Sequence, residues 1–271
     1  MSALIFYPLI LSEWEETRDT LQKYCRMVGA IREAISIPLP HSYQTNLLLS
    51  SKGFTTSLLP KNINSPESTF EVILDIENQR LIIESCFGEP MRIALTGQSL
   101  NALCDETCSL MSDIGIAPPL EKPSFLEGKR GRFDPEPLLH YWYTITSVNQ
   151  LLNKIKTELR NDTSPVQLRP DDLAFVLTWF GKNFQSKNNF GGQQVEFGFS
   201  TGDSVVQEAY FYISTFPDKE KIEELTEKEC LLVVNGRPKK AILQFNNLIS
   251  AEDKEKVIMK FFRRAAAAFN E

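Results

Sequence analysis

The densest group of side chains that could do chemistry lies around His41. An imidazole titrates near neutral pH and can act as an acid or a base, while hydroxyl and amide groups can hold a polar ligand. An aromatic side chain near the start of a later helix, Trp142, could wall a pocket shared between two halves of the chain. The sequence therefore predicts a ligand-binding group made of His41, Tyr43, Gln44, Thr55, Thr56 and Trp142.

His41 also has a structural interpretation, in which it ties a helix–strand loop to a backbone carbonyl. The two interpretations differ in the effect of His41→Ala. A buried tether leaves its partner unsatisfied when it is removed, which costs roughly 1–3 kcal/mol of stability. A ligand-binding or catalytic His41 leaves the stability nearly unchanged.

Three further motifs are weaker. Cys104 and Cys108 lie one helical turn apart, but zinc needs about four ligands and none follows nearby, so core packing is predicted. Asp171 and Asp172 are predicted to lie in a solvated turn at the start of a strand, and the Gly-Gly-Gln at 191–193 in an ordinary loop. No catalytic residue, metal site or cofactor is predicted.

Composition narrows the function classes. The chain has 271 residues and a formal net charge of −6, which disfavours general binding to nucleic acid. The apolar run at 3–10 is too short to cross a bilayer and lacks a basic lead, so no membrane segment or signal peptide is expected. Five cysteines without framework spacing suit reduced thiols. A cytoplasmic protein is therefore predicted.

Hydrophobic periodicity predicts helices that begin after Ser12, at residue 100, at Asp134 and after Ser250. Between the first two helices, strands are predicted at 47–51, 54–59, 70–76, 81–85 and 91–95. After the third helix, they are predicted at 173–180, 195–200, 209–214, 231–234 and 241–245, with a hairpin turn at Asn235-Gly236. The short connections indicate antiparallel sheets.

The repeated order of elements predicts an α+β protein with two αβ(4–5)α halves. The first half covers residues 1–116 and the second 134–271, joined by a Pro- and Gly-rich linker at 117–133. Helices are expected to cover one face of each sheet, and the sheets could join into a saddle or half-barrel. As an internal duplication, the halves should pair their strands in the same order.

Several short motifs carry a family resemblance. They are Thr-Arg-Asp-Thr-Leu at 17–21, His-Ser-Tyr-Gln at 41–44, Lys-Gly-Phe-Thr-Thr-Ser at 52–57 before Pro60, and Phe-Asp-Pro-Glu at 133–136 before Trp142. With these motifs, nearly the whole chain resembles a family of bacterial proteins defined as a domain of unknown function. The resemblance implies a shared fold and a bacterial source, but no activity. Where the family has a His and aromatics after Ser-Pro-Val, this chain has Gln167 to Asp171.

Three functions stay open at this point. The favoured one is a cytoplasmic protein that binds a small molecule or a peptide in the groove between the halves. The second is an enzyme with a site centred on His41 between the two halves, and the third is a structural interaction protein. Neither nucleic acid nor a membrane is an expected partner, and the sequence does not predict the oligomeric state.

Overall fold

The computed structural model describes residues 4–62, 65–116, 128–159, 162–180, 194–203, 205–216, 222–223, 231–233 and 239–269, without the side chains of 40–42, 62, 65–67 and 231–233. The chain divides into two compact units. The central unit comprises Trp14–Trp142 and Leu168–Asp171. The terminal unit comprises Met1–Glu13, Tyr143–Gln167 and Asp172–Glu271. The predicted linker lies outside the described residues at 117–127, and residues 128–133 belong to the central unit.

The central unit contains an antiparallel sheet with its strands in the order β1-β2-β4-β5-β6 and β3 beside β4. The strands are β1 (Leu48–Leu49), β2 (Gly53–Thr55), β3 (Leu59–Asn62), β4 (Ser65–Asp75), β5 (Arg80–Ser85) and β6 (Met91–Ala94). Leu48 lies opposite Thr55, so the predicted pairing of the first two strands is confirmed. Gly53 allows β2 to lie beside β4 on its other side, because a Cβ there would lie 1.9 Å from the Leu74 carbonyl oxygen.

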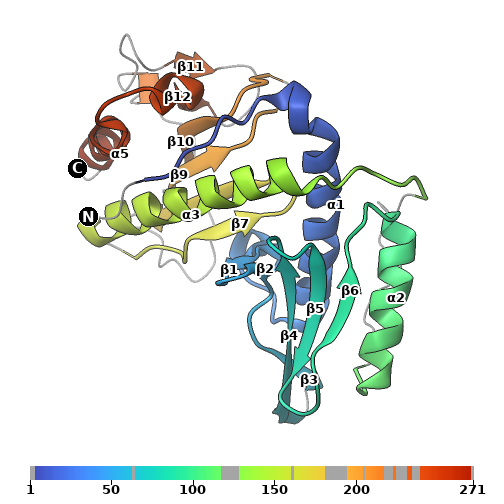
Figure 1. Cartoon of the computed structure of the whole chain (residues 1–271). Coiled ribbons are helices and arrows are strands. Elements are labelled where there is room, and N and C mark those ends of the chain that lie inside the picture. Colours follow the sequence, from blue (N-terminus) through green and yellow to red (C-terminus); the bar gives the residue numbers. More distant parts are fainter. Residues whose placement is uncertain are drawn as a thin grey trace. The chain divides into compact units, whose positions relative to one another are not determined.

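Three described helices flank this sheet in the chain. Helix α1 (Leu11–Ile35) and the 3-10 helix η1 (Pro40–Thr45) precede it, and α2 (Leu100–Asp113) follows it. The predicted apolar stripe of α1 is buried, and it includes Leu21, Tyr24, Cys25, Val28 and Ile31. In α2, the Ser99 hydroxyl accepts a hydrogen bond from the Ala102 amide and so caps the first turn. Figure 1 shows α2 alongside β6, and the two elements are in contact.

The terminal sheet has the order β11-β12-β10-β9-β8-β7. Its strands are β7 (Gln167–Arg169), β8 (Ala174–Phe180), β9 (Gln194–Ser200), β10 (Tyr210–Phe216), β11 (Leu231–Val233) and β12 (Lys240–Gln244). Helix α3 (Pro135–Glu158) precedes this sheet in the chain, and α4 (Asn246–Ile249) and α5 (Lys254–Phe269) follow it. Of Ser250 and Asp253, which the sequence predicts together as the cap of this helix, Asp253 caps α5, because its Oδ1 accepts from the Lys256 amide at 3.1 Å.

Aromatic side chains form the core between this sheet and α5. Phe262 of α5 packs edge-on against Phe197 of β9 and Phe211 of β10, with ring centroids 5.5 and 6.0 Å apart. Ion pairs between α3 and α5, such as Arg263 with Glu158 at 2.7 Å, keep these helices together. Two antiparallel sheets combined with helices confirm the predicted α+β class.

The two sheets differ in strand order, which corrects the prediction of a common order. In the central sheet, β4, β5 and β6 lie side by side in chain order. In the terminal sheet, β12 lies between β10 and β11. The repeat seen in the sequence is thus a repeat of element types, since hydrophobic periodicity reports the type of each element and not its neighbour. The predicted hairpin turn at Asn235-Gly236 lies outside the described residues.

Two side chains of α3 bind the extended segment before α1, within the terminal unit. The Ser147 hydroxyl accepts from the Ile5 amide and donates to the Ile5 carbonyl, each at 2.9 Å. The Thr144 hydroxyl accepts from the Tyr7 amide at 3.2 Å. Between them, the Phe6 ring packs against Phe245 with centroids 5.1 Å apart. These bonds satisfy backbone groups that no sheet partner serves.

We predict that Ser147→Ala destabilises the protein by roughly 1–3 kcal/mol, because it removes the two hydrogen bonds to Ile5, each of which contributes roughly 0.5–1.5 kcal/mol. Thr146→Ala is the matched control, since the Thr146 hydroxyl bonds only to the Tyr143 carbonyl of its own helix. Urea unfolding followed by circular dichroism measures both variants. Equal stability of the two variants would contradict this account of the segment.

Candidate functional site

The predicted group around His41 lies at η1 and at the end of β2. The backbone of His41 belongs to η1, whereas its side chain lies outside the described residues. Tyr43 is half-buried, and its carbonyl accepts from Arg32 at 3.2 Å. Gln44 is buried; its Oε1 accepts from the Leu39 amide at 2.9 Å and its Nε2 donates to Glu33 at 3.3 Å. Gln44 therefore fastens η1 to α1.

Both threonines are buried, and they hold the turn after β2. The Thr55 hydroxyl accepts from the Ser57 amide at 2.8 Å and donates to Glu71. The Thr56 hydroxyl donates to the Ser57 carbonyl and accepts from the Val72 amide, at 2.8 and 3.0 Å. These bonds support Ser57, which has a φ of 60° in the left-handed region. Each hydroxyl is thus already engaged in the fold.

The structure gives these predicted residues separate local partners. Trp142 packs edge-on against Phe54, with ring centroids 6.1 Å apart. Gln44 bonds to Leu39 and Glu33, whereas the threonines bond to β4 and its neighbouring turn. Whether His41 binds a ligand stays a prediction.

The remaining sequence motifs have structural partners. Asp171 forms an ion pair with Arg26 at 3.3 Å, and Cys104 is buried on α2. Cys25, Cys86, Cys104 and Cys108 are not in disulfides. The described part of the chain contains no group of three His, Cys, Asp or Glu side chains that could hold a metal ion. Gly191 and Gly192 lie outside it. None of the helices in the described ranges has the length and hydropathy needed to cross a membrane.

A polar cluster occupies the face of the terminal sheet opposite α5. Tyr210 donates to Asp203 and Tyr212 donates to Glu196, each at 2.6 Å. Lys240 donates to the Tyr210 hydroxyl at 3.3 Å and lies 4.8 Å from the Tyr212 ring centroid. Strand alternation places Tyr210 and Tyr212 on this face, with Phe211 between them on the other.

The cluster is self-contained electrostatically. Burial raises the pKa of Tyr210, and its bond to Asp203 raises it further, so the phenol stays protonated. Burial opposes ionisation of Asp203, but bonds from Tyr210, Val206 and Val205 and the charge of Lys240 outweigh it and lower its pKa. A protonated phenol paired with an ionised carboxylate is a stable arrangement rather than an acid–base pair poised near neutral pH. We therefore assign this cluster a structural role.

A different arrangement surrounds Gly131 in the central unit. Residues 128–133, called the Gly131 segment below, run between α1 and the turn that precedes α2. The Gly131 amide donates to the Gly97 carbonyl at 2.9 Å, and Gln79 donates to the Phe133 carbonyl at 3.0 Å. The Phe133 ring packs on Tyr24 of α1, with centroids 5.2 Å apart. These contacts therefore hold the segment in place at Phe133, its last residue, and at Gly131, near its middle.

Glycine is required at two places in this arrangement. A Cβ on Gly131 would lie 2.0 Å from Oγ1 of Thr20, a side chain buried on α1. Gly97 has a φ of 77°, and a Cβ there would lie 2.3 Å from the Gly131 carbonyl oxygen. Only residues without a Cβ allow the Gly131 backbone to approach both the Thr20 side chain and the Gly97 backbone this closely.

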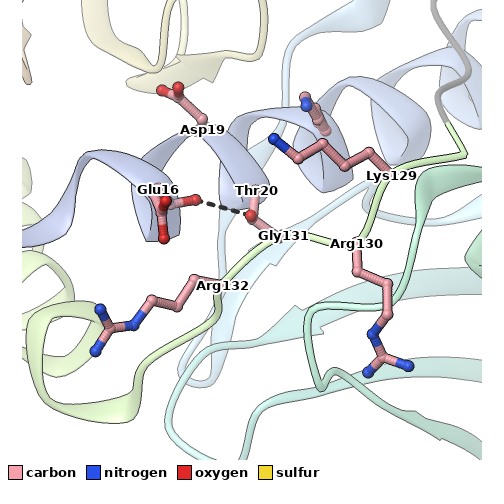
Figure 2. Close-up of a pocket in the computed structure, with 8 residues that line it drawn as sticks. Glu16, Asp19, Thr20, Lys129, Arg130, Gly131 and Arg132 are labelled. Atoms are coloured by element: carbon pink, nitrogen blue, oxygen red, sulfur yellow. Dashed lines mark hydrogen bonds between the residues drawn. The ribbon is translucent and has the colours of Figure 1, made fainter.

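The Gly131 segment and α1 enclose a pocket of about 350 Å³, called the Gly131 pocket below. It is lined by Glu16, Asp19, Thr20, Lys23, Lys129, Arg130, Gly131 and Arg132. Figure 2 shows Lys129 lying over α1, while Arg130 extends on the other side of the segment. Arg130 donates to the Thr96 carbonyl at 3.4 Å. The volume is at the lower end of the range for small-molecule sites.

Several charges of the pocket are paired with neighbours outside it. Asp19 accepts from Arg18 at 2.8 Å, and Arg132 pairs with Asp134 at 2.5 Å. Lys129 is exposed and has no ion-pair partner among the described residues. The pocket therefore contains a lysine that forms no ion pair with any described residue.

Sequence reasoning missed this pocket, because the basic run near Gly131 was interpreted as part of a linker. A Gly-Lys-Arg-Gly-Arg stretch at 128–132 was the available signal. Two glycines within a basic run are compatible with a flexible linker. They are equally compatible with a backbone that lies close against another element. The partner on α1, Thr20, gives no sign of this contact in the sequence.

We predict that Gly131→Ala destabilises the central unit by roughly 1–3 kcal/mol, because the segment must move away from Thr20. Gly128→Ala is the control in the same segment, since the nearest atom to its Cβ would be 3.9 Å away. Adding Thr20→Ala to Gly131→Ala should recover part of the loss, since it removes the obstructing Oγ1. Thermal melts compare these variants, and a Gly128→Ala loss as large as that of Gly131→Ala would refute the close approach.

Asp203 gives a pH-dependent prediction. Its folded pKa lies below the ordinary value, so its stabilising contribution is present above the unfolded pKa of about 3.9 and is lost as the pH falls through the folded pKa. The wild type should be more stable than Asp203→Asn at pH 7, and this difference in the free energy of unfolding should disappear in acid. Urea unfolding at pH 7, 5, 4 and 3 measures it, with Glu252→Gln as an exposed control. A gap that stays constant with pH would be the contrary result.

Comparison with known proteins bears on the whole chain. Neither the curated proteins nor the solved structures give a match. The model of a family of unknown function, DUF5996, matches residues 6–270 of the 271. The predicted membership of a family of unknown function is thereby confirmed: the chain belongs to the DUF5996 family.

Proposed function

We propose that this protein binds a small ligand and holds an anionic group of that ligand in the Gly131 pocket. The observation that carries the proposal is the Lys129 ammonium, which lines a pocket of about 350 Å³ and has no ion-pair partner among the described residues. Lys23 of α1 lines the same pocket and adds a second cation. The proposal keeps the sequence-based preference for a binding protein but moves the site from the His41 group to α1.

The rigid surroundings of Lys129 favour binding. The segment that carries this lysine is held by the hydrogen bond of Gly131, and the α1 surface below it belongs to a helix whose apolar face is buried. A site that is formed before the ligand arrives loses less conformational entropy on binding. The exposure of Lys129 acts in the opposite direction, because solvent screens an exposed charge. An isolated anion should therefore bind weakly, and the rest of the ligand must add affinity.

We also propose that the protein works in a bacterial cytoplasm and does not bind nucleic acid. Thiols that are not oxidised to disulfides at Cys25, Cys86, Cys104 and Cys108 support a reducing compartment. The net charge of −6 supports the absence of general nucleic-acid binding, because a phosphate backbone is repelled.

The test is a calorimetric titration with inorganic phosphate at low ionic strength. We expect a dissociation constant on the order of 1 mM for the wild type, as befits a ligand of few atoms. Lys129→Ala should weaken binding by about tenfold, because a charge-assisted hydrogen bond is lost, and Lys129→Arg should retain most of it. Added salt should weaken wild-type binding.

Lys52→Ala is the matched control, because it removes one exposed lysine of the same unit that does not line the pocket. It should bind phosphate like the wild type. Equal losses in Lys129→Ala and Lys52→Ala would show a general charge effect and would overturn the proposed site, as would the absence of any binding to the wild type.

A further inference from the structure

We infer that the ligand of the Gly131 pocket is a small zwitterion, whose anionic group faces Lys129 and whose cationic group faces Glu16. The inference rests on the proposed function and adds a second requirement to it. It comes from the pairing of charges around the pocket, where one acid and one lysine have no ion-pair partner among the described residues.

Glu16 is that acid. Its side chain is exposed, lines the pocket and has no ion-pair or hydrogen-bond partner in the described part of the chain. The bond drawn in Figure 2 involves its backbone, because the Thr20 hydroxyl donates to the Glu16 carbonyl at 2.8 Å. The other acid of the pocket, Asp19, is engaged by Arg18 through two bonds at 3.0 and 2.8 Å. Among the described residues, the pocket thus presents one acid, Glu16, and one lysine, Lys129, that have no ion-pair partner, while Arg130 extends to the Thr96 carbonyl.

These two charges select between ligand classes. A ligand with an anionic group alone is attracted by Lys129 but repelled by Glu16. A ligand that also carries an ammonium satisfies both groups, and complementary charges give specificity even where each pair contributes little affinity. The anionic group can be a phosphate or a carboxylate, since an ammonium such as that of Lys129 binds either as a point charge.

The size of the pocket limits the skeleton that joins the two charges. A volume of about 350 Å³ is near the lower limit for small-molecule sites, so it accommodates a chain of few atoms. The hydrogen bond between Gly131 and Gly97 fixes the backbone from which Lys129 extends beside α1. Amino acids and phosphorylated amino alcohols are ligands of this class.

Two pairs of isosteric probes test the inference. Phosphoethanolamine and propyl phosphate have the same anionic group, but only the first ends in an ammonium. Beta-alanine and butyrate form the equivalent pair with a carboxylate. Calorimetric titration of the full chain with all four compounds measures, within each pair, how much more tightly the zwitterion binds than the plain anion. The pair that binds more tightly shows whether the ligand carries a phosphate or a carboxylate.

For the wild type, we expect the ammonium-bearing member of the tighter pair to bind about two- to fivefold more strongly than its isostere. Glu16→Gln should reduce affinity for the zwitterion and raise affinity for the plain anion, so that the preference disappears. Glu15→Gln removes a neighbouring exposed acid that does not line the pocket, and it should leave the preference unchanged. Glu16 is exposed, so Gln is tolerated there, and a thermal melt verifies folding.

The outcomes separate the two proposals. If no probe binds the wild type, both the proposed function and this inference fail. If plain anions bind and depend on Lys129, but the ammonium gives no advantage or Glu16→Gln leaves the preference intact, the inference alone is overturned. An equal effect of Glu15→Gln and Glu16→Gln would also overturn it, because the preference would then come from the net charge.

Discussion

The close approach of Gly131 to Thr20 is the constraint on which the proposed site depends. A backbone without a Cβ lets residues 128–133 lie directly on α1, where any other residue would collide with Oγ1 of Thr20 at about 2.0 Å. The Gly131 amide then reaches the Gly97 carbonyl at 2.9 Å. This contact holds Lys129 over α1 and creates the pocket, so the site follows from packing rather than from any catalytic motif.

The Tyr210 cluster and the Gly131 pocket differ in how completely their charges are paired. In the terminal unit, the Tyr210 and Tyr212 hydroxyls each donate to a carboxylate, and Lys240 lies close to both rings. Buried polar groups that satisfy one another stabilise and specify a fold. In the central unit, exposed charges at Glu16 and Lys129 have no partner among the described residues. Unmatched charges beside a pocket are a better indication of a ligand than matched ones.

The sequence predicted the elements well and the site poorly, for physical reasons. Periodicity located α1, α2 and most strands, because burial imposes a repeat of 3.6 or 2 residues. It could not predict that β12 would lie between β10 and β11, since strand order depends on long-range pairing. The predicted polar residues Gln44, Thr55 and Thr56 are abundant hydrogen-bonding groups, but the backbone uses them. The approach of Gly131 to α1 joins residues more than one hundred positions apart, which no local pattern reveals.

The central claim is that an anion binds between the Gly131 segment and α1, and the most direct measurement is a residue-resolved NMR titration. Backbone amide shifts of the labelled protein would be followed while phosphoethanolamine is added. The account predicts saturable shifts concentrated at residues 128–132 and along α1 at residues 16–23. Shifts that are absent, that increase linearly without saturation, or that concentrate around His41 or around Tyr210 would contradict it.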